Sequence, residues 1–125
     1  MSAKPEEAPE AAVVLSTALV KAWTILDVKQ SVISKVIGLS PATVSRLSKG
    51  EYHLNKKAGD WDAAVTFIRM YHSLAGLLDG DETLMKKWLH THNTDFGKAP
   101  IALLSETGGG VHNLGGYLDS MRGRF

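Results

Sequence analysis

The sequence predicts an all-α fold, and three observations support this prediction. Apolar residues recur at helical spacing along most of the chain, and no segment alternates apolar and polar residues as a half-buried strand does. Residues 29–50 have the pattern of two short helices joined by a tight turn. A chain of 125 residues suits one domain, or one small domain with an appendage. We expect about seven helices in all.

The first helix is predicted at residues 13–26, after a tail. Residues 1–12 are rich in Pro, Glu and Ala, and they are predicted to be disordered. The apolar residues that follow lie on one helical face: Val14, Leu15, Ala18, Leu19, Ala22, Trp23 and Leu26.

Residues 29–50 carry the most specific local pattern. Gln30 opens the first helix, and Gly38 ends it because glycine adopts the positive φ that the turn needs. Ser40 is the predicted N-cap of the second helix, and Pro41 takes its first position, where no N–H is needed. The residues predicted to face the core are Ile33, Val36, Ile37, Leu39, Val44 and Leu47.

The longest helix is predicted at residues 61–78, where it would join the two halves of the molecule. Asp60 is its predicted N-cap, and Asp62 suits the positive end of the helix dipole. Between this helix and the preceding pair, residues 51–59 are predicted to form a polar connection. The apolar stripe of the long helix is Trp61, Ala64, Val65, Ile68, Tyr71, Leu74, Ala75 and Leu78.

Three shorter helices are predicted in the C-terminal part. Asp81 caps the first, Pro100 begins a short one that ends at Leu104, and a last helix from Val111 follows the glycines at 108–110. A change in composition near residue 80 indicates a domain boundary. The predicted division is a tail at 1–12, a helix-turn-helix domain at 13–80 and a C-terminal module at 81–125.

The positive charge of the chain is concentrated on and just after the helix pair. Residues 29–57 contain six Lys or Arg residues and one acidic residue, a local charge of +5, whereas the whole chain has a net charge of +1. Such a surface suits phosphate, although a solvated basic helix pair would have the same composition. The chain has no cysteine, no membrane-length apolar run and no signal-peptide pattern, so we expect a cytoplasmic protein.

The helix pair has the spacing of a DNA-binding helix-turn-helix, in which the second helix enters the major groove. Arg46 is suited to bind a guanine edge or a phosphate, and Lys35, Lys56 and Lys57 are further phosphate candidates. A homodimer on a two-fold operator is expected because one motif reads few bases. A purely structural role for the motif remains an alternative. The predicted DNA-binding residues are Gln30, Ser40, Ala42, Thr43, Ser45, Arg46 and Lys49.

The sequence offers little support for a metal site, a cofactor or catalysis. His90 and His92 are two residues apart, which does not place them on one helical face, and no Cys or carboxylate cluster accompanies them. The glycines at 108–110 lack the Lys-Ser/Thr of a phosphate-binding loop. No nucleophile–base pair can be argued from spacing. We therefore expect no metal, no cofactor and no enzymatic activity.

Two resemblances extend this interpretation. The N-terminal half resembles the Xre/Cro family of repressors at Gln30, Ile33, Ser34, Gly38-Leu39-Ser40 and Thr43-Val44-Ser45-Arg46. From about residue 84 onward, the chain resembles the toxin-binding domain of MbcA/ParS/Xre antitoxins. The matching positions are Trp88-Leu89, Asn93, Phe96-Gly97, Pro100, Leu103-Leu104, the glycines at 108–110 and the segment 111–118.

The second resemblance implies the antitoxin of a type II toxin–antitoxin pair. The implied partner is a RES-domain toxin, an NAD+-degrading enzyme, whose active site the antitoxin would block while the complex represses its own operon. The terminal residues 122–125 are a candidate projecting arm. The alternative is a stand-alone dimeric regulator whose C-terminal module dimerises or senses a ligand. The expected toxin-binding residues are Trp88, Asn93, Phe96, Gly97, Pro100, Leu103, Leu104, Arg122, Arg124 and Phe125.

Overall fold

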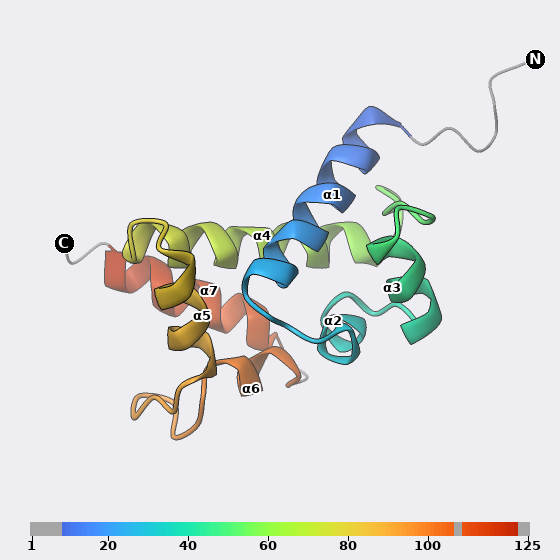
Figure 1. Ribbon diagram of the computed structural model, residues 1–125. Coiled ribbons are helices and arrows are strands. Elements are labelled where there is room, and N and C mark those ends of the chain that lie inside the picture. The colour runs from blue at the N-terminus through green and yellow to red at the C-terminus, as the bar shows by residue number, and fades with distance from the viewer. Residues whose placement is uncertain (1–8, 107–108, 123–125) are drawn as a thin grey trace, which may run out of the picture.

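The computed structural model describes residues 9–106 and 109–122, and within these ranges it contains seven α-helices and no strand (Figure 1). The predicted all-α fold is confirmed. None of these helices is long and apolar enough to cross a membrane. The helices are α1 (Glu10–Ile25), α2 (Gln30–Ile37), α3 (Pro41–Ser48), α4 (Gly59–Leu77), α5 (Glu82–His90), α6 (Ile101–Leu104) and α7 (Gly110–Arg122).

The long helix α4 lies at the centre of the molecule (Figure 1). It packs most extensively against α7, and it also contacts α1, α2 and α5. Helices α4 and α7 run in the same direction, since Ser73 contacts Asp119 and Gly76 lies beside Arg122. The buried side chains form one continuous hydrophobic core to which all seven helices contribute. The helix pair α2–α3 and the C-terminal helices therefore share a single core.

The buried face of α4 differs from the predicted stripe. Ala64 and Leu74 are buried as predicted, but Phe67 and Met70, which the stripe omits, are also fully buried. The reason is that neighbours cover α4 from several sides, so its buried arc is wider than that of a surface helix. The other members of the predicted stripe are half-buried.

Two helix starts differ from the prediction by two residues or more, and those of α6 and α7 differ by one. Helix α1 begins at Glu10, three residues before the predicted start, so residues 10–12 are helical rather than part of a tail, and residues 1–8 lie outside the described residues. Helix α4 begins at Gly59, and Asp60 lies inside its first turn instead of capping it. The Asp60 side chain is buried and accepts a hydrogen bond from the Tyr52 hydroxyl at 3.2 Å. The Asp60 side chain therefore makes this tertiary contact with Tyr52 instead of the predicted capping hydrogen bond.

Two polar contacts fasten α1 to distant segments, one near its middle and one at its C-terminal end. The Ser16 hydroxyl oxygen accepts a hydrogen bond from the Leu54 N–H at 2.9 Å, and Leu54 itself is buried. The predicted polar connection at 51–59 is therefore anchored to the core at its centre. At the C-terminal end of α1, His90 Nε2 lies 2.9 Å from the Leu26 carbonyl oxygen. This contact gives one of the two closely spaced histidines a structural role.

The start of α7 depends on a glycine. Helix α7 begins at Gly110, where a Cβ would lie only 1.8 Å from the carbonyl oxygen of Leu103. The backbones of α6 and α7 can approach this closely only because Gly110 has no side chain. The predicted glycine break therefore coincides with a close helix contact, although Gly108 lies outside the described residues.

We predict that Gly110→Ala lowers the free energy of unfolding by about 2 kcal/mol or more, because the added methyl group forces α6 and α7 apart. Urea denaturation measures this change. Gly116→Ala, in the same helix with no atom within 4 Å of the added Cβ, is the matched control. It should raise stability by up to ~1 kcal/mol, because alanine is the better helix former. Equal effects of the two substitutions would contradict the account.

Candidate functional site

The turn between α2 and α3 has the geometry that the sequence predicts. Gly38 has a φ of 74° and ends α2, and its N–H donates to the Ser34 carbonyl oxygen at 3.0 Å. Ser40 is the N-cap of α3, and its hydroxyl oxygen accepts a hydrogen bond from the Thr43 N–H at 3.2 Å. Pro41 occupies the first helical position. These local features set the orientation of α3 relative to α2.

The inner face of α3 is buried, and its outer side carries most of the predicted DNA-binding residues. Val44 and Leu47 are buried in the core together with Ile33 and Ile37 of α2. On the outer side, Thr43 and Ser45 are half-buried. The exposed members of the predicted set are Gln30, Ser40, Ala42, Arg46 and Lys49.

Arg46 contacts a residue that the sequence analysis did not select. Its guanidinium carbon lies 5.9 Å from the centre of the Tyr52 ring, and its Nη2 donates to the Thr43 hydroxyl at 3.3 Å. Burial and the neighbouring Asp60 carboxylate raise the pKa of Tyr52 above its ordinary value. Tyr52 was missed because the sequence signal at 51–59 is only that of a polar connection.

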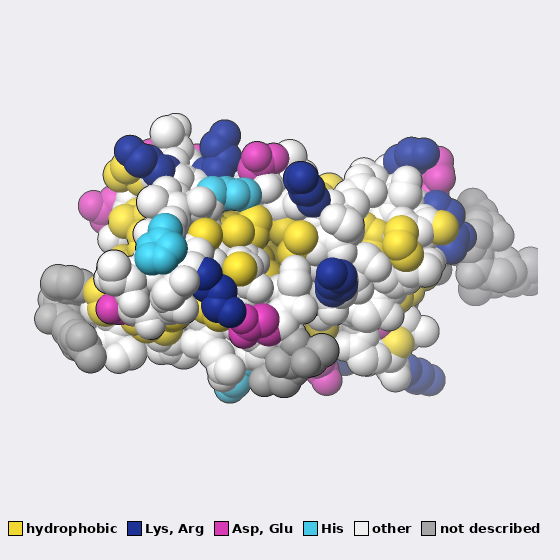
Figure 2. All heavy atoms as spheres, turned by 90° about the horizontal axis from the view of Figure 1, so that it is seen from below, with side chains coloured by type: hydrophobic (Ala, Val, Ile, Leu, Met, Phe, Trp, Pro, Cys, Tyr) yellow, Lys and Arg dark blue, Asp and Glu magenta, His cyan; other side chains and the backbone are white. Residues whose placement is uncertain are grey.

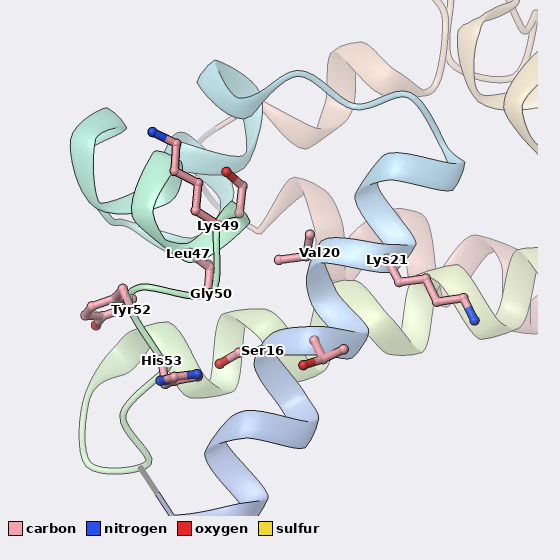
Figure 3. Close-up of a pocket in the computed structure, with 10 residues that line it drawn as sticks. Ser16, Val20, Lys21, Leu47, Lys49, Gly50, Tyr52 and His53 are labelled. Carbon is pink, nitrogen blue, oxygen red and sulfur yellow. The ribbon is translucent and has the colours of Figure 1, made fainter. Parts of the chain in front are cut away.

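A groove of about 390 Å³ lies between α1 and α3, with Tyr52 and His53 on one side (Figure 3). Ser16 and Val20 line it from α1, and Lys21 and Lys49 lie at its edges. In Figure 3 these two lysine side chains extend away from the cavity in different directions. Their charges therefore do not converge on one position within the groove.

The C-terminal helices are joined by an aromatic cluster centred on Tyr117 of α7. The Phe96 ring meets it edge-on at a centroid distance of 4.7 Å, and the Trp88 ring stacks with it at 6.5 Å. The Tyr117 hydroxyl donates to Asp95 at 2.6 Å. Trp88 and Phe96 belong to the predicted toxin-binding set, whereas Tyr117 was predicted only as a residue of the last helix. Such a cluster depends on tertiary contacts, so sequence spacing does not reveal it.

The segment between α5 and α6 is shaped by Asn93 and Gly97. The Asn93 side chain accepts from the Asp95 N–H at 2.9 Å, and the Asn93 carbonyl accepts from the Gly97 N–H at 3.0 Å. Gly97 has a φ of 71°, which favours glycine. Pro100 and Leu104 are buried. In this structure these four residues of the predicted set support the segment and α6, and Leu103 is half-buried beside them.

An apolar groove of about 320 Å³ adjoins this segment. Leu84 of α5 lies on its wall and is 47% exposed, which makes it one of the few exposed large hydrophobic residues in the described chain. Trp88 forms another part of the wall, and Lys87 and His92 add polar groups. On the face of the molecule shown in Figure 2, hydrophobic side chains reach the surface among Lys, Arg and His side chains.

Arg122 lies within α7 rather than in a projecting arm. Its guanidinium packs over Gly76 of α4, where an added Cβ would lie 3.0 Å from Arg122 Nε. It also lies 3.9 Å from Asp119, which accepts a hydrogen bond from Ser73 at 2.5 Å. Arg122 therefore folds back onto α4. The last two residues of the predicted set, Arg124 and Phe125, lie outside the described residues.

Comparison with known proteins finds a similarity in the C-terminal part of the chain. Residues 73–124 match the family model of the antitoxin Xre/MbcA/ParS C-terminal toxin-binding domain. The matched range begins inside α4 and includes α5, α6 and α7. A search of curated proteins finds no match. The helix-turn-helix residues precede the matched range, so their role stays a prediction.

We predict that Ser40→Ala lowers the free energy of unfolding by about 1 kcal/mol, because the Thr43 N–H loses the hydroxyl oxygen that caps α3. Thermal or urea unfolding measures the loss. Ser31→Ala is the control, because Ser31 is an exposed serine of α2. Its effect should stay within about 0.5 kcal/mol, as for most surface substitutions. An equal loss at both serines would show that the cap contributes nothing to stability.

Proposed function

We propose that this chain is the antitoxin of a type II toxin–antitoxin pair. The observation that carries the proposal is the toxin-binding-domain match over residues 73–124. In the same chain α2 and α3, two short helices joined by a tight turn, precede the matched range. The proposed partner is a RES-domain toxin that degrades NAD+, and the antitoxin blocks its active site by direct contact. The proposal assigns no reaction to the chain itself.

The toxin-binding surface is proposed to include the exposed side of α5 and the end of α7. Leu84 and Trp88 support this assignment, since they line an apolar groove within the matched domain. Exposed apolar positions of this kind commonly mark protein interfaces, and aromatic and Arg side chains are frequent anchors there. Arg124 and Phe125, which follow α7, are the proposed residues that reach the toxin's active site.

The DNA-binding surface is proposed to be the outer side of α3 with the start of α2. Exposed Arg46 and Lys49 would contact DNA there, and Gln30 lies at the N-terminus of α2, where backbone N–H groups favour a phosphate. The exposed Lys35, Lys56 and Lys57 add positive charge. A homodimer would place two such surfaces on a two-fold operator, and the toxin complex would thereby regulate its own operon in the cytoplasm.

We predict that the two activities can be separated. Arg46→Ala should weaken binding to DNA from upstream of the chain's own gene by about fivefold to one-hundredfold, the range for losing one arginine contact. It should leave capture and inhibition of the co-expressed RES-domain toxin unchanged. The double variant with Arg124→Ala and Phe125→Ala should capture and inhibit the toxin less well but bind DNA as the parent protein does. Fluorescence anisotropy reports DNA binding, and pull-down with an NAD+-consumption assay reports toxin binding.

Arg69→Ala is the charge-matched control, since Arg69 is an exposed residue of α4 outside the helix pair. It should change neither activity. Loss of both activities in the Arg46→Ala variant would contradict two separate surfaces. DNA binding without any capture of the toxin would instead support a stand-alone regulator.

A further inference from the structure

We infer that Tyr52 is a positioning residue for Arg46, and that Asp60 in turn fixes Tyr52. The inference rests on the proposed DNA-binding role of α3 and deepens it, because it gives two residues outside the helix pair a role in supporting the recognition surface. The inference is based on a series of contacts that runs from exposed Arg46 through half-buried Tyr52 to buried Asp60.

The first step is the support of the guanidinium from two sides. The Tyr52 ring lies 5.9 Å from the Arg46 guanidinium carbon, within the range of a cation–π interaction. On its own helix, Arg46 donates to the Thr43 hydroxyl at 3.3 Å. An exposed arginine otherwise samples many rotamers, and ordering it on binding costs free energy. Arg46 is therefore partly ordered before it meets DNA.

The second step is the placement of Tyr52 itself. The Glu51 N–H donates to the Arg46 carbonyl oxygen at 2.8 Å, which folds the chain back after α3 and brings Tyr52 beneath Arg46. The Tyr52 hydroxyl then donates to Asp60 Oδ2 at 3.2 Å. A tyrosine phenol is protonated at neutral pH and can therefore donate this hydrogen bond. Burial and the Asp60 carboxylate raise the pKa of Tyr52 further in the same direction.

The third step is the burial of Asp60. Asp60 is only 4% exposed, and its other oxygen, Oδ1, is buried without a hydrogen-bond partner among the described residues. A buried carboxylate is costly unless it is paired, so the Tyr52 hydroxyl is an important compensating contact. The N-terminus of α4 also stabilises the negative charge, since Asp60 lies in its first turn. Asp60 is thus a fixed anchor for the ring.

The arrangement leaves the charge of Arg46 available. The ring lies between Arg46 and Asp60, and within the described part of the chain no acidic side chain forms an ion pair with Arg46. A carboxylate in direct contact would occupy the guanidinium donors that a phosphate or a guanine edge needs. An aromatic support orders the side chain without using those donors.

A double-mutant cycle tests the inference. The probe is a fluorescein-labelled duplex from the region upstream of the chain's own gene, and anisotropy gives the affinity of the full chain. Tyr52→Leu should weaken binding about twofold to fivefold, the effect of losing a cation–π contact. It should have no further effect in the Arg46→Ala background, because Tyr52 acts through Arg46. Tyr52→Phe, which keeps the ring but loses its anchor, should lie between Tyr52→Leu and the parent protein.

Tyr71→Leu is the matched control. Tyr71 is a half-buried tyrosine of α4 whose pKa is also raised by burial, and its ring contacts His72 instead of an arginine. This substitution should leave DNA affinity unchanged. Urea unfolding of each variant shows whether it is folded under the binding conditions.

A second measurement does not depend on DNA. In NMR spectra of the free protein, the side-chain resonances of Arg46 should shift when Tyr52→Leu removes the ring current, and they should not shift with Tyr71→Leu. Unchanged Arg46 resonances, or an equal loss of DNA affinity in both backgrounds of the cycle, would overturn the positioning role of Tyr52. If the Tyr52→Phe variant binds DNA with the affinity of the parent protein, the hydrogen bond to Asp60 is not needed to position Arg46. If Arg46→Ala alone leaves DNA binding intact, the proposed role of α3 fails, and the resonances still report separately whether Tyr52 orders Arg46.

Discussion

The burial of the inner face of α4 is the constraint on which the rest of the structure depends. Phe67, Met70 and Leu74 are fully buried there, and they contact a core to which every other helix contributes. A helix of 19 residues is about 28 Å long, so it can serve both ends of a small domain. Its first turn holds Asp60 near α3, and its last turns pack Gly76 against Arg122 of α7.

In this arrangement, the exposed residues of the two proposed binding surfaces are distinct from the buried residues that stabilise the fold. The proposed DNA-contacting residues lie on α2 and α3, beside the start of α4, and the proposed toxin-contacting residues of the described chain lie on α5, beside the end of α4 (Figure 1). Substitutions of exposed residues can therefore affect one surface alone. Substitutions such as Phe67→Ala would act on both, because they weaken the common core by about 3–5 kcal/mol. The toxin-binding-domain match, which begins inside α4, is consistent with a core that crosses between the two parts.

The features that could be predicted from the sequence are those that short-range chemistry determines. Gly38, Ser40, Pro41 and Asp81 mark helix ends through their own backbone preferences and side chains, and all four lie where the sequence places them. The roles of Tyr52, Asp60, Phe67 and Tyr117 could not be predicted, because each depends on a partner from another part of the fold. For the same reason, the predicted toxin-binding set mixes two kinds of residue. Trp88 lines the apolar groove beside exposed Leu84, whereas Leu104 is buried in the core.

The central claim is that one core carries two separate binding surfaces. Hydrogen–deuterium exchange of the full chain tests this claim most directly, measured alone, with the proposed RES-domain toxin, and with DNA from upstream of the chain's own gene. The account predicts that the toxin slows exchange in residues 82–122 and that DNA slows exchange in residues 29–50. Slower exchange of residues 29–50 with the toxin alone, or of residues 82–122 with DNA alone, would contradict it.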